Sequence, residues 1–192
     1  ASPFIGWPGL LRWCVTVAAG AFLLVSHWEG LTANLADRVL AMENLFLLWL
    51  IYPLVKTLHE FGHAYAIKRW GGEVHEMGVM ILVFVPIPYV DASSSTAFWD
   101  KRKRIVVGAA GILTEMFLAA LAVIVWVNVE PGAVRAVAFN TIIIAGVSTI
   151  LFNGNPLLRF DAYYILSDLL EIPNLAMRSA RYMGYLVKRY AL

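Results

Sequence analysis

Residues 45–70 read LFLLWLIYPLVKTLHEFGHAYAIKRW, and this stretch decides how the chain can fold. Its first part is apolar, and apart from Pro53 it carries no turn signal before His59. A helix needs roughly 20 mainly apolar residues to cross a bilayer, so the stretch predicts a membrane-spanning helix over about residues 44–69. Ionisable side chains inside a span are costly and usually functional. The charged cluster at 59–63 is therefore a candidate site.

The composition of the whole chain points to a membrane protein. Of its 192 residues, 60% are hydrophobic and only 15% are charged, which lies outside the range of soluble domains. This length fits one membrane-embedded domain over residues 1–192 with about four spanning helices. The net charge of +2 gives no indication of a nucleic-acid partner. The only cysteine, Cys14, excludes an intrachain disulfide and a cysteine-based zinc site.

Three further apolar stretches complete an all-α polytopic protein, at residues 13–28, 105–129 and 136–158. Residues 77–90 are apolar too, but Pro86, Pro88 and many β-branched residues favour a small strand-like or re-entrant insertion. Residues 175–192 alternate basic with apolar side chains, as in an interfacial amphipathic helix, although a solvated tail has a similar composition. With four spans, most Lys and Arg residues fall on the same side of the membrane as the two termini. The positive-inside rule therefore predicts cytoplasmic N- and C-termini.

The cluster His59-Glu60-Phe61-Gly62-His63 has the pattern H-E-x-x-H. On a helix its two histidines lie one turn apart on the same face and can bind one metal ion, with Glu60 beside it. Zinc lowers the pKa of a bound water, and a neighbouring carboxylate can accept the proton released when that water attacks a carbonyl. The alternative is a metal-free helix in which these polar side chains satisfy one another. The other histidines, His27 and His75, fall in predicted loops and are not expected to be ligands.

Two acidic residues elsewhere are candidates for the same site. A catalytic zinc site needs a third protein ligand, and Asp161 follows a broken span end that could turn it back into the bundle; alternatively it is a surface residue paired with Arg159. Glu115 is the only charged residue between 105 and 129. At 1.5 Å per residue it lies roughly 16 Å deep, close to the roughly 15 Å depth of His59. It could donate to a developing oxyanion, hydrogen-bond a ligand histidine, or merely bridge helices as a protonated acid.

Together these motifs resemble the site-2 protease family of intramembrane zinc metalloproteases. That family pairs H-E-x-x-H with a later Asn, a Pro three residues on, and an Asp five residues after that, and Asn153, Pro156 and Asp161 have this spacing. The resemblance covers about residues 44–165. It implies a zinc cofactor held by His59, His63 and Asp161, Glu60 as catalytic base, and hydrolysis of a peptide bond in a membrane-associated or transmembrane substrate.

The chain departs from the family pattern at two positions. Ala162 follows Asp161 where the family usually has Gly, and Glu115 stands where it often has Asn. With Asn153 and Asn155, Glu115 is a candidate to bind the oxyanion or orient a ligand. The chain most resembles a bacterial branch of peptide zinc metalloproteases. This resemblance implies that the protein is located in the bacterial inner membrane. A non-proteolytic zinc-binding subunit of a larger membrane assembly is the alternative; a metal transporter fits less well, because no chain of polar residues runs through successive spans.

Overall fold

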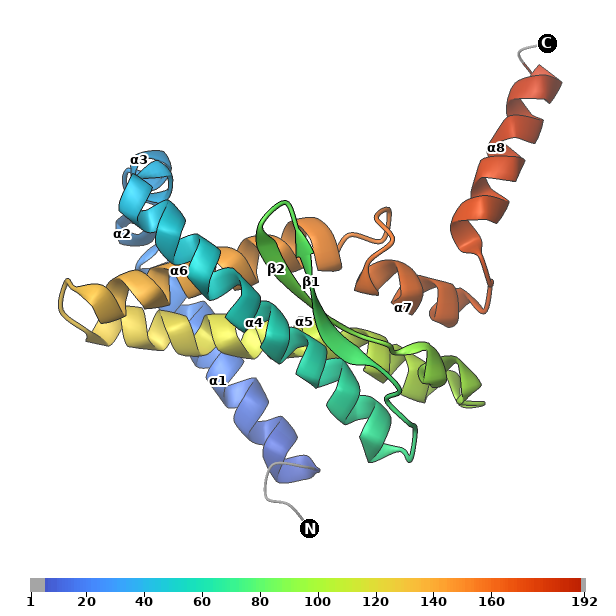
Figure 1. The fold of residues 1–192 in the computed structure, drawn as a ribbon, viewed down its shortest axis with the longest axis horizontal. Helices are drawn as coiled ribbons and strands as arrows, with labels where there is room; N and C mark the ends of the chain where they lie inside the picture. Colours follow the sequence, from blue (N-terminus) through green and yellow to red (C-terminus); the bar gives the residue numbers. More distant parts are fainter. Residues whose placement is uncertain (1–5, 191–192) are drawn as a thin grey trace.

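The computed structural model describes residues 6–190, which form a helical bundle with one small hairpin (Figure 1). The main elements are α1 (Trp7–Ser26), α2 (Trp28–Thr32), α3 (Leu35–Leu40), α4 (Met42–Arg69), β1 (Met77–Leu82), β2 (Val85–Val90), η1 (Ser93–Ala97), α5 (Lys101–Asn128), α6 (Ala133–Val147), η2 (Ser148–Asn153), α7 (Asp161–Leu170) and α8 (Leu175–Tyr190).

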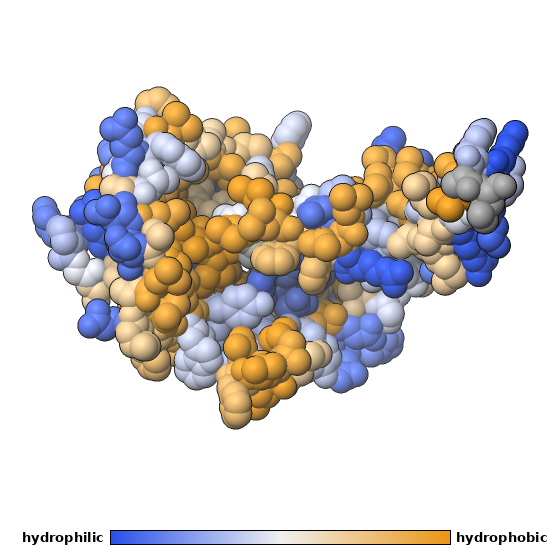
Figure 2. Space-filling model, turned by 90° about the horizontal axis from the view of Figure 1, so that it is seen from above, coloured by the Kyte–Doolittle hydropathy of each residue, from blue (hydrophilic) through white to orange (hydrophobic). Residues whose placement is uncertain are grey.

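Four helices in the described part are long and apolar enough to cross a membrane: Trp7–Ser26, Met42–Arg69, Lys101–Asn128 and Ala133–Asn153. Large apolar side chains are exposed along all of them, and Figure 2 shows hydrophobic residues over much of one face. A bilayer is the solvent in which such a surface is stable. The predicted fold class is therefore confirmed, although the first span begins at Trp7 and so includes Arg12.

Helix α5 is the centre of the bundle and packs against α1, α4, α6 and α7. Two glycines bring α4 and α5 close together. A Cβ atom at Gly62 would collide with Thr114 and the Ala110 carbonyl, and one at Gly111 would collide with the rings of His59 and His63. Small residues allow such close approach between spanning helices, and this one places the two histidines directly against α5.

The predicted strand-like insertion is an antiparallel hairpin in which Met77 pairs with Val90 and Leu82 with Val85. Its two turn residues, Val83 and Phe84, have φ angles of 48° and 63°, as a two-residue hairpin turn of this hand requires. Strand β2 packs against α4, and Trp49 Nε1 donates to the Phe84 carbonyl at 3.2 Å. The hairpin is thus fixed beside the helix that carries the H-E-x-x-H motif.

The last span changes form before it ends. Helix α6 passes into a π-helical turn, η2, which ends at Asn153, and an irregular segment then leads to α7, which begins at Asp161. The break that the sequence predicted there is present. The final helix, α8, projects away from the bundle (Figure 1); residues 191 and 192 of the predicted amphipathic segment lie outside the described residues, and its place at the membrane surface stays a prediction.

Candidate metal centre

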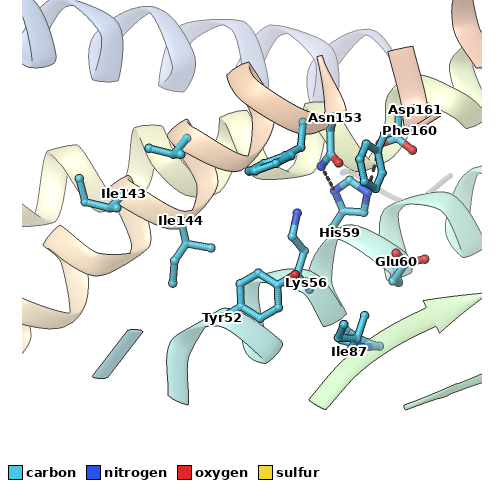
Figure 3. Close-up of a pocket in the computed structure, with 13 residues that line it drawn as sticks. Tyr52, Lys56, His59, Glu60, Ile87, Ile143, Ile144, Asn153, Phe160 and Asp161 are labelled. Carbon is cyan, nitrogen blue, oxygen red and sulfur yellow. Dashed lines mark hydrogen bonds and ion pairs between the residues drawn. The ribbon is translucent and has the colours of Figure 1, made fainter. Parts of the chain in front are cut away.

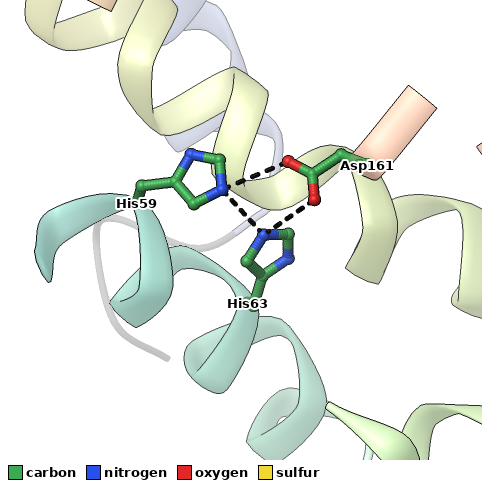
Figure 4. Close-up of side chains that lie close together, drawn as sticks. All are labelled: His59, His63 and Asp161. Carbon is green, nitrogen blue, oxygen red and sulfur yellow. Dashed lines mark hydrogen bonds and ion pairs between the residues drawn. The ribbon is translucent and has the colours of Figure 1, made fainter. Parts of the chain in front are cut away.

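Three side chains from two helices converge between α4 and α7 (Figure 4). His59 Nε2 lies 3.1 Å from His63 Nε2 and 3.1 Å from Asp161 Oδ2, and His63 Nε2 lies 3.5 Å from Asp161 Oδ1. The histidines are one helical turn apart on α4, and Asp161 is the first residue of α7. Asp161 therefore contacts the two histidines, which the alternative of a surface residue paired with Arg159 did not predict.

The chemistry of this group suits a cation. Asp161 Oδ2 is buried without a hydrogen-bond partner among residues 6–190. The two oxygens of Asp161 face imidazole nitrogens, Oδ2 at 3.1 Å from His59 Nε2 and Oδ1 at 3.5 Å from His63 Nε2. The residue is thus a carboxylate facing two imidazole nitrogens, a ligand set that zinc accepts. These three residues could hold a metal ion.

The outward-facing nitrogens of both histidines have hydrogen-bond partners. His63 Nδ1 lies 2.7 Å from the Val107 carbonyl, and His59 Nδ1 lies 3.1 Å from Glu115 Oε1. A carbonyl and a carboxylate accept hydrogen bonds, so both rings carry the proton on Nδ1 and direct the Nε2 lone pair towards Asp161. This tautomer is the one that a metal ligand needs.

Glu115 is fully buried in α5 and connects the site to two other spans. Its Oε1 lies 2.6 Å from Lys56 Nζ; its Oε2 accepts from Thr149 Oγ1 at 2.6 Å and from Asn153 Nδ2 at 3.3 Å. Of the three roles considered for Glu115, the contact with His59 Nδ1 favours that of orienting a ligand. The ion pair with Lys56 argues against a protonated acid that only bridges helices.

Lys56 is the residue of the site that sequence reasoning missed. It lies three residues before His59 on the same helix and lines the cavity next to the candidate ligands. A signal was present in the sequence, because Lys56 and Glu115 are isolated opposite charges in two predicted spans, and charges at that depth usually pair.

Glu60 lies between two cavities. One, of about 520 Å³, is mainly apolar and is bounded by α4, β2 and the end of the last span (Figure 3). The other, of about 370 Å³, is lined by His63 and by Ser93, Ser95 and Thr96. Glu60 and Asp161 line both, and the backbone of Val90 hydrogen-bonds the Glu60 carboxylate. The candidate base is therefore held by the hairpin at the junction of two cavities, the second of which has more polar side chains in its lining.

The two predicted asparagines lie in different surroundings. Asn153 is buried, and its amide is within 3.5 Å of His59 Nδ1. The Asn155 side chain instead accepts from the Leu157 amide at 3.0 Å and stabilises the turn before α7. The structure thus brings Asn153 to the site and gives Asn155 a local structural contact.

Comparisons of the chain with protein-family models, with curated proteins and with solved structures found no match.

Proposed function

We propose that this protein is a zinc metalloendopeptidase that hydrolyses a peptide bond of a membrane-associated or transmembrane substrate. The observation that carries the proposal is the convergence of His59, His63 and Asp161, whose ligand atoms all lie within 4.8 Å of one another. Glu60 lies next to this group, held by the Val90 backbone. Two histidines, a carboxylate ligand and an adjacent carboxylate base are the groups that zinc-dependent peptide hydrolysis uses.

A zinc ion held by these three residues would act as a Lewis acid towards a water molecule and a substrate carbonyl. Glu60 accepts the proton of the attacking water and then donates a proton to the departing amine. The Glu115 carboxylate keeps His59 in the tautomer that directs Nε2 inwards, and the Val107 carbonyl does the same for His63. Lys56 balances the charge of Glu115, which would otherwise be an unpaired anion inside a span.

The outer edge of β2 is the proposed place for an extended substrate. The Asp91 amide donates to the Glu76 carbonyl across the hairpin, so alternation along the ladder turns the backbone groups of residues 86, 88 and 90 outwards. Pro86 and Pro88 have no N–H, and this edge therefore offers their carbonyls as acceptors for substrate amides. Ile87 and Pro88 line the apolar cavity, so a strand added here would enter the cavity beside Glu60.

The same proposal covers location and orientation. We infer a bacterial inner membrane with the end of the bundle that carries Lys68, Arg69 and Lys101–Arg104 on the cytoplasmic side, because basic residues concentrate there. The polar cavity lined by Ser93 and Thr96 adjoins this end and would admit water to Glu60.

The test compares the wild type with Glu60→Gln and His63→Ala after reconstitution with a pool of synthetic single-span peptides. Zinc content is measured by mass spectrometry of the metal, and cleavage by the appearance of new peptide termini. Glu60→Gln should keep zinc and lose cleavage, because the amide cannot accept a proton; His63→Ala should lose both, and the control His75→Ala neither. Wild-type protein that binds zinc but cleaves as little as Glu60→Gln would favour a non-proteolytic zinc subunit. Cleavage by Glu60→Gln at the rate of a wild type that does cleave would refute the assignment of the base.

A further inference from the structure

A third cavity, of about 490 Å³, lies at the end of the bundle farthest from Lys101–Arg104. In Figure 1 this is the left-hand end, where α3 lies near the connection between α5 and α6. Its lining comes from four segments of chain and includes Trp126, Gly132 and Phe139. Arg38 and Arg135 are the only charged side chains in the lining, so the cavity is positively charged, and it shares no residue with the candidate metal centre.

Neither arginine has a carboxylate partner among residues 6–190. The Arg38 guanidinium is held by the carbonyls of Gly30 and Leu31 and stacks 3.9 Å from the centre of the Phe139 ring. Arg135 stacks 4.5 Å from the centre of the Trp126 ring. Glu29 shares a neighbouring cavity with Arg135 but forms no ion pair with it. Stacking fixes two planar donors in place and leaves their positive charge unneutralised.

The two charges also act on each other. Burial lowers the pKa of Arg38, and the charge of Arg135 lowers it further. Two cations held in one cavity at a span end repel each other unless an anion lies with them. Planar guanidinium groups bind phosphate oxygens in pairs, which lysine cannot do in the same way.

The residues that line the cavity include further hydrogen-bond donors. Trp126 is only 5% exposed, and its indole N–H has no acceptor among the described residues. The first turn of α6, which follows Gly132, begins at the cavity wall, and its free backbone amides and helix dipole favour an anion. The span ends lie at the level of a bilayer where lipid phosphates are concentrated.

We propose that this cavity binds a phosphate group through Arg38 and Arg135. The group belongs to an anionic phospholipid headgroup or to a soluble phosphate compound, since both present the same oxygens. It bridges α3 to the first turn of α6 and neutralises the two arginines. The site is independent of the proposed peptidase activity.

The experiment uses the full chain in an uncharged detergent. Native mass spectrometry measures binding of phosphatidylglycerol and of phosphatidylcholine, and thermal unfolding is followed with and without inorganic phosphate. The variant is Arg38→Gln with Arg135→Gln. The control, Arg102→Gln with Arg159→Gln, removes the same charge from exposed positions outside the cavity. Arg38→Lys with Arg135→Lys keeps the charge but loses the planar donors, and it serves if the glutamine variant fails to fold.

Charge-assisted hydrogen bonds are the strong ones, so the cavity variant should bind at least about tenfold more weakly than wild type and control. Loss of phosphatidylglycerol binding identifies a lipid headgroup. Loss of stabilisation by inorganic phosphate, with lipid binding unchanged, identifies a soluble phosphate compound. If the cavity variant and the lysine variant bind both probes as the control does, the arginines serve only to hold the helices together and the proposal is wrong.

Discussion

Replacing Lys56 with methionine should destabilise the fold without weakening the binding of zinc. The substitution removes the ammonium group 2.6 Å from Oε1 of Glu115, a side chain with no exposed surface. Removing one partner of a buried ion pair leaves an uncompensated charge and costs about 3–5 kcal/mol. The Glu115 carboxylate still accepts from His59 in this variant, so the ligand geometry is kept.

Changing the carboxylate itself should cost stability, because Lys56 loses its partner, and should also weaken zinc binding. Glu115→Gln keeps the shape of the side chain but removes the charge beside His59 Nδ1, which lies 3.1 Å away. Loss of such an outer partner lowers metal affinity by about 10- to 100-fold, equivalent to about 1.4–2.8 kcal/mol. Glu115→Leu, which also removes the hydrogen bond, should lie at or beyond the upper end of that range.

The double variant Lys56→Met/Glu115→Gln separates the two effects. It should recover much of the stability lost by either single change, because no buried charge is left without a partner, while its zinc affinity stays low. Zinc affinity is measured by competition with a chromophoric chelator, and stability by thermal unfolding in detergent. Thr141→Val, which removes only a local bond to the Val137 carbonyl, is the control. Wild-type zinc affinity in folded Glu115→Leu would refute the role given to Glu115.

Three further predictions concern the packing around the histidines, the third metal ligand and the orientation in the membrane. Gly111→Ala should lower zinc content, because its methyl group would meet both histidine rings. Gly146→Ala, where a Cβ atom meets nothing within 4 Å, should leave zinc content unchanged. Metal analysis of the two variants tests this prediction. Asp161→Ala should lose metal while Asp91→Ala keeps it, and equal zinc content in the two would contradict the third ligand. A cysteine at the exposed Ala97, in a chain with Cys14 replaced, should resist an impermeant thiol reagent outside intact cells, and efficient labelling would reverse the proposed orientation.

The sequence was a good guide to the spans and the hairpin because both depend on local signals. Apolar runs of membrane-spanning length predicted the long helices, and Pro86 and Pro88 distinguished the hairpin from them. The boundaries were less accurate. The first helix begins at Trp7 rather than near residue 13, because a proline in the first turn favours a helix start and Arg12 is tolerated near the end of a span.

The partners within the site were harder to predict, because they depend on packing between helices. Depth along two helices suggested that Glu115 could reach the histidines, but not that it would contact His59 rather than His63. The π-helical turn that brings Asn153 to the same carboxylate has no clear sequence signature. Arg38 and Arg135 are nearly a hundred residues apart, so their common cavity became visible only in the folded chain.

The pairing of Lys56 with Glu115 explains how a carboxylate can be fully buried in α5 beside the candidate metal centre. A divalent ion held here would offset the charges of the Asp161 and Glu60 carboxylates, so another buried carboxylate would leave the site anionic. The ammonium group of Lys56, one turn before His59 on the same face of α4, restores the balance. In this chain a Glu at position 115 therefore needs a cation beside it, whereas an Asn at that position would not. Glu115→Asn should accordingly make Lys56 dispensable, so that Lys56→Met costs little stability in that background.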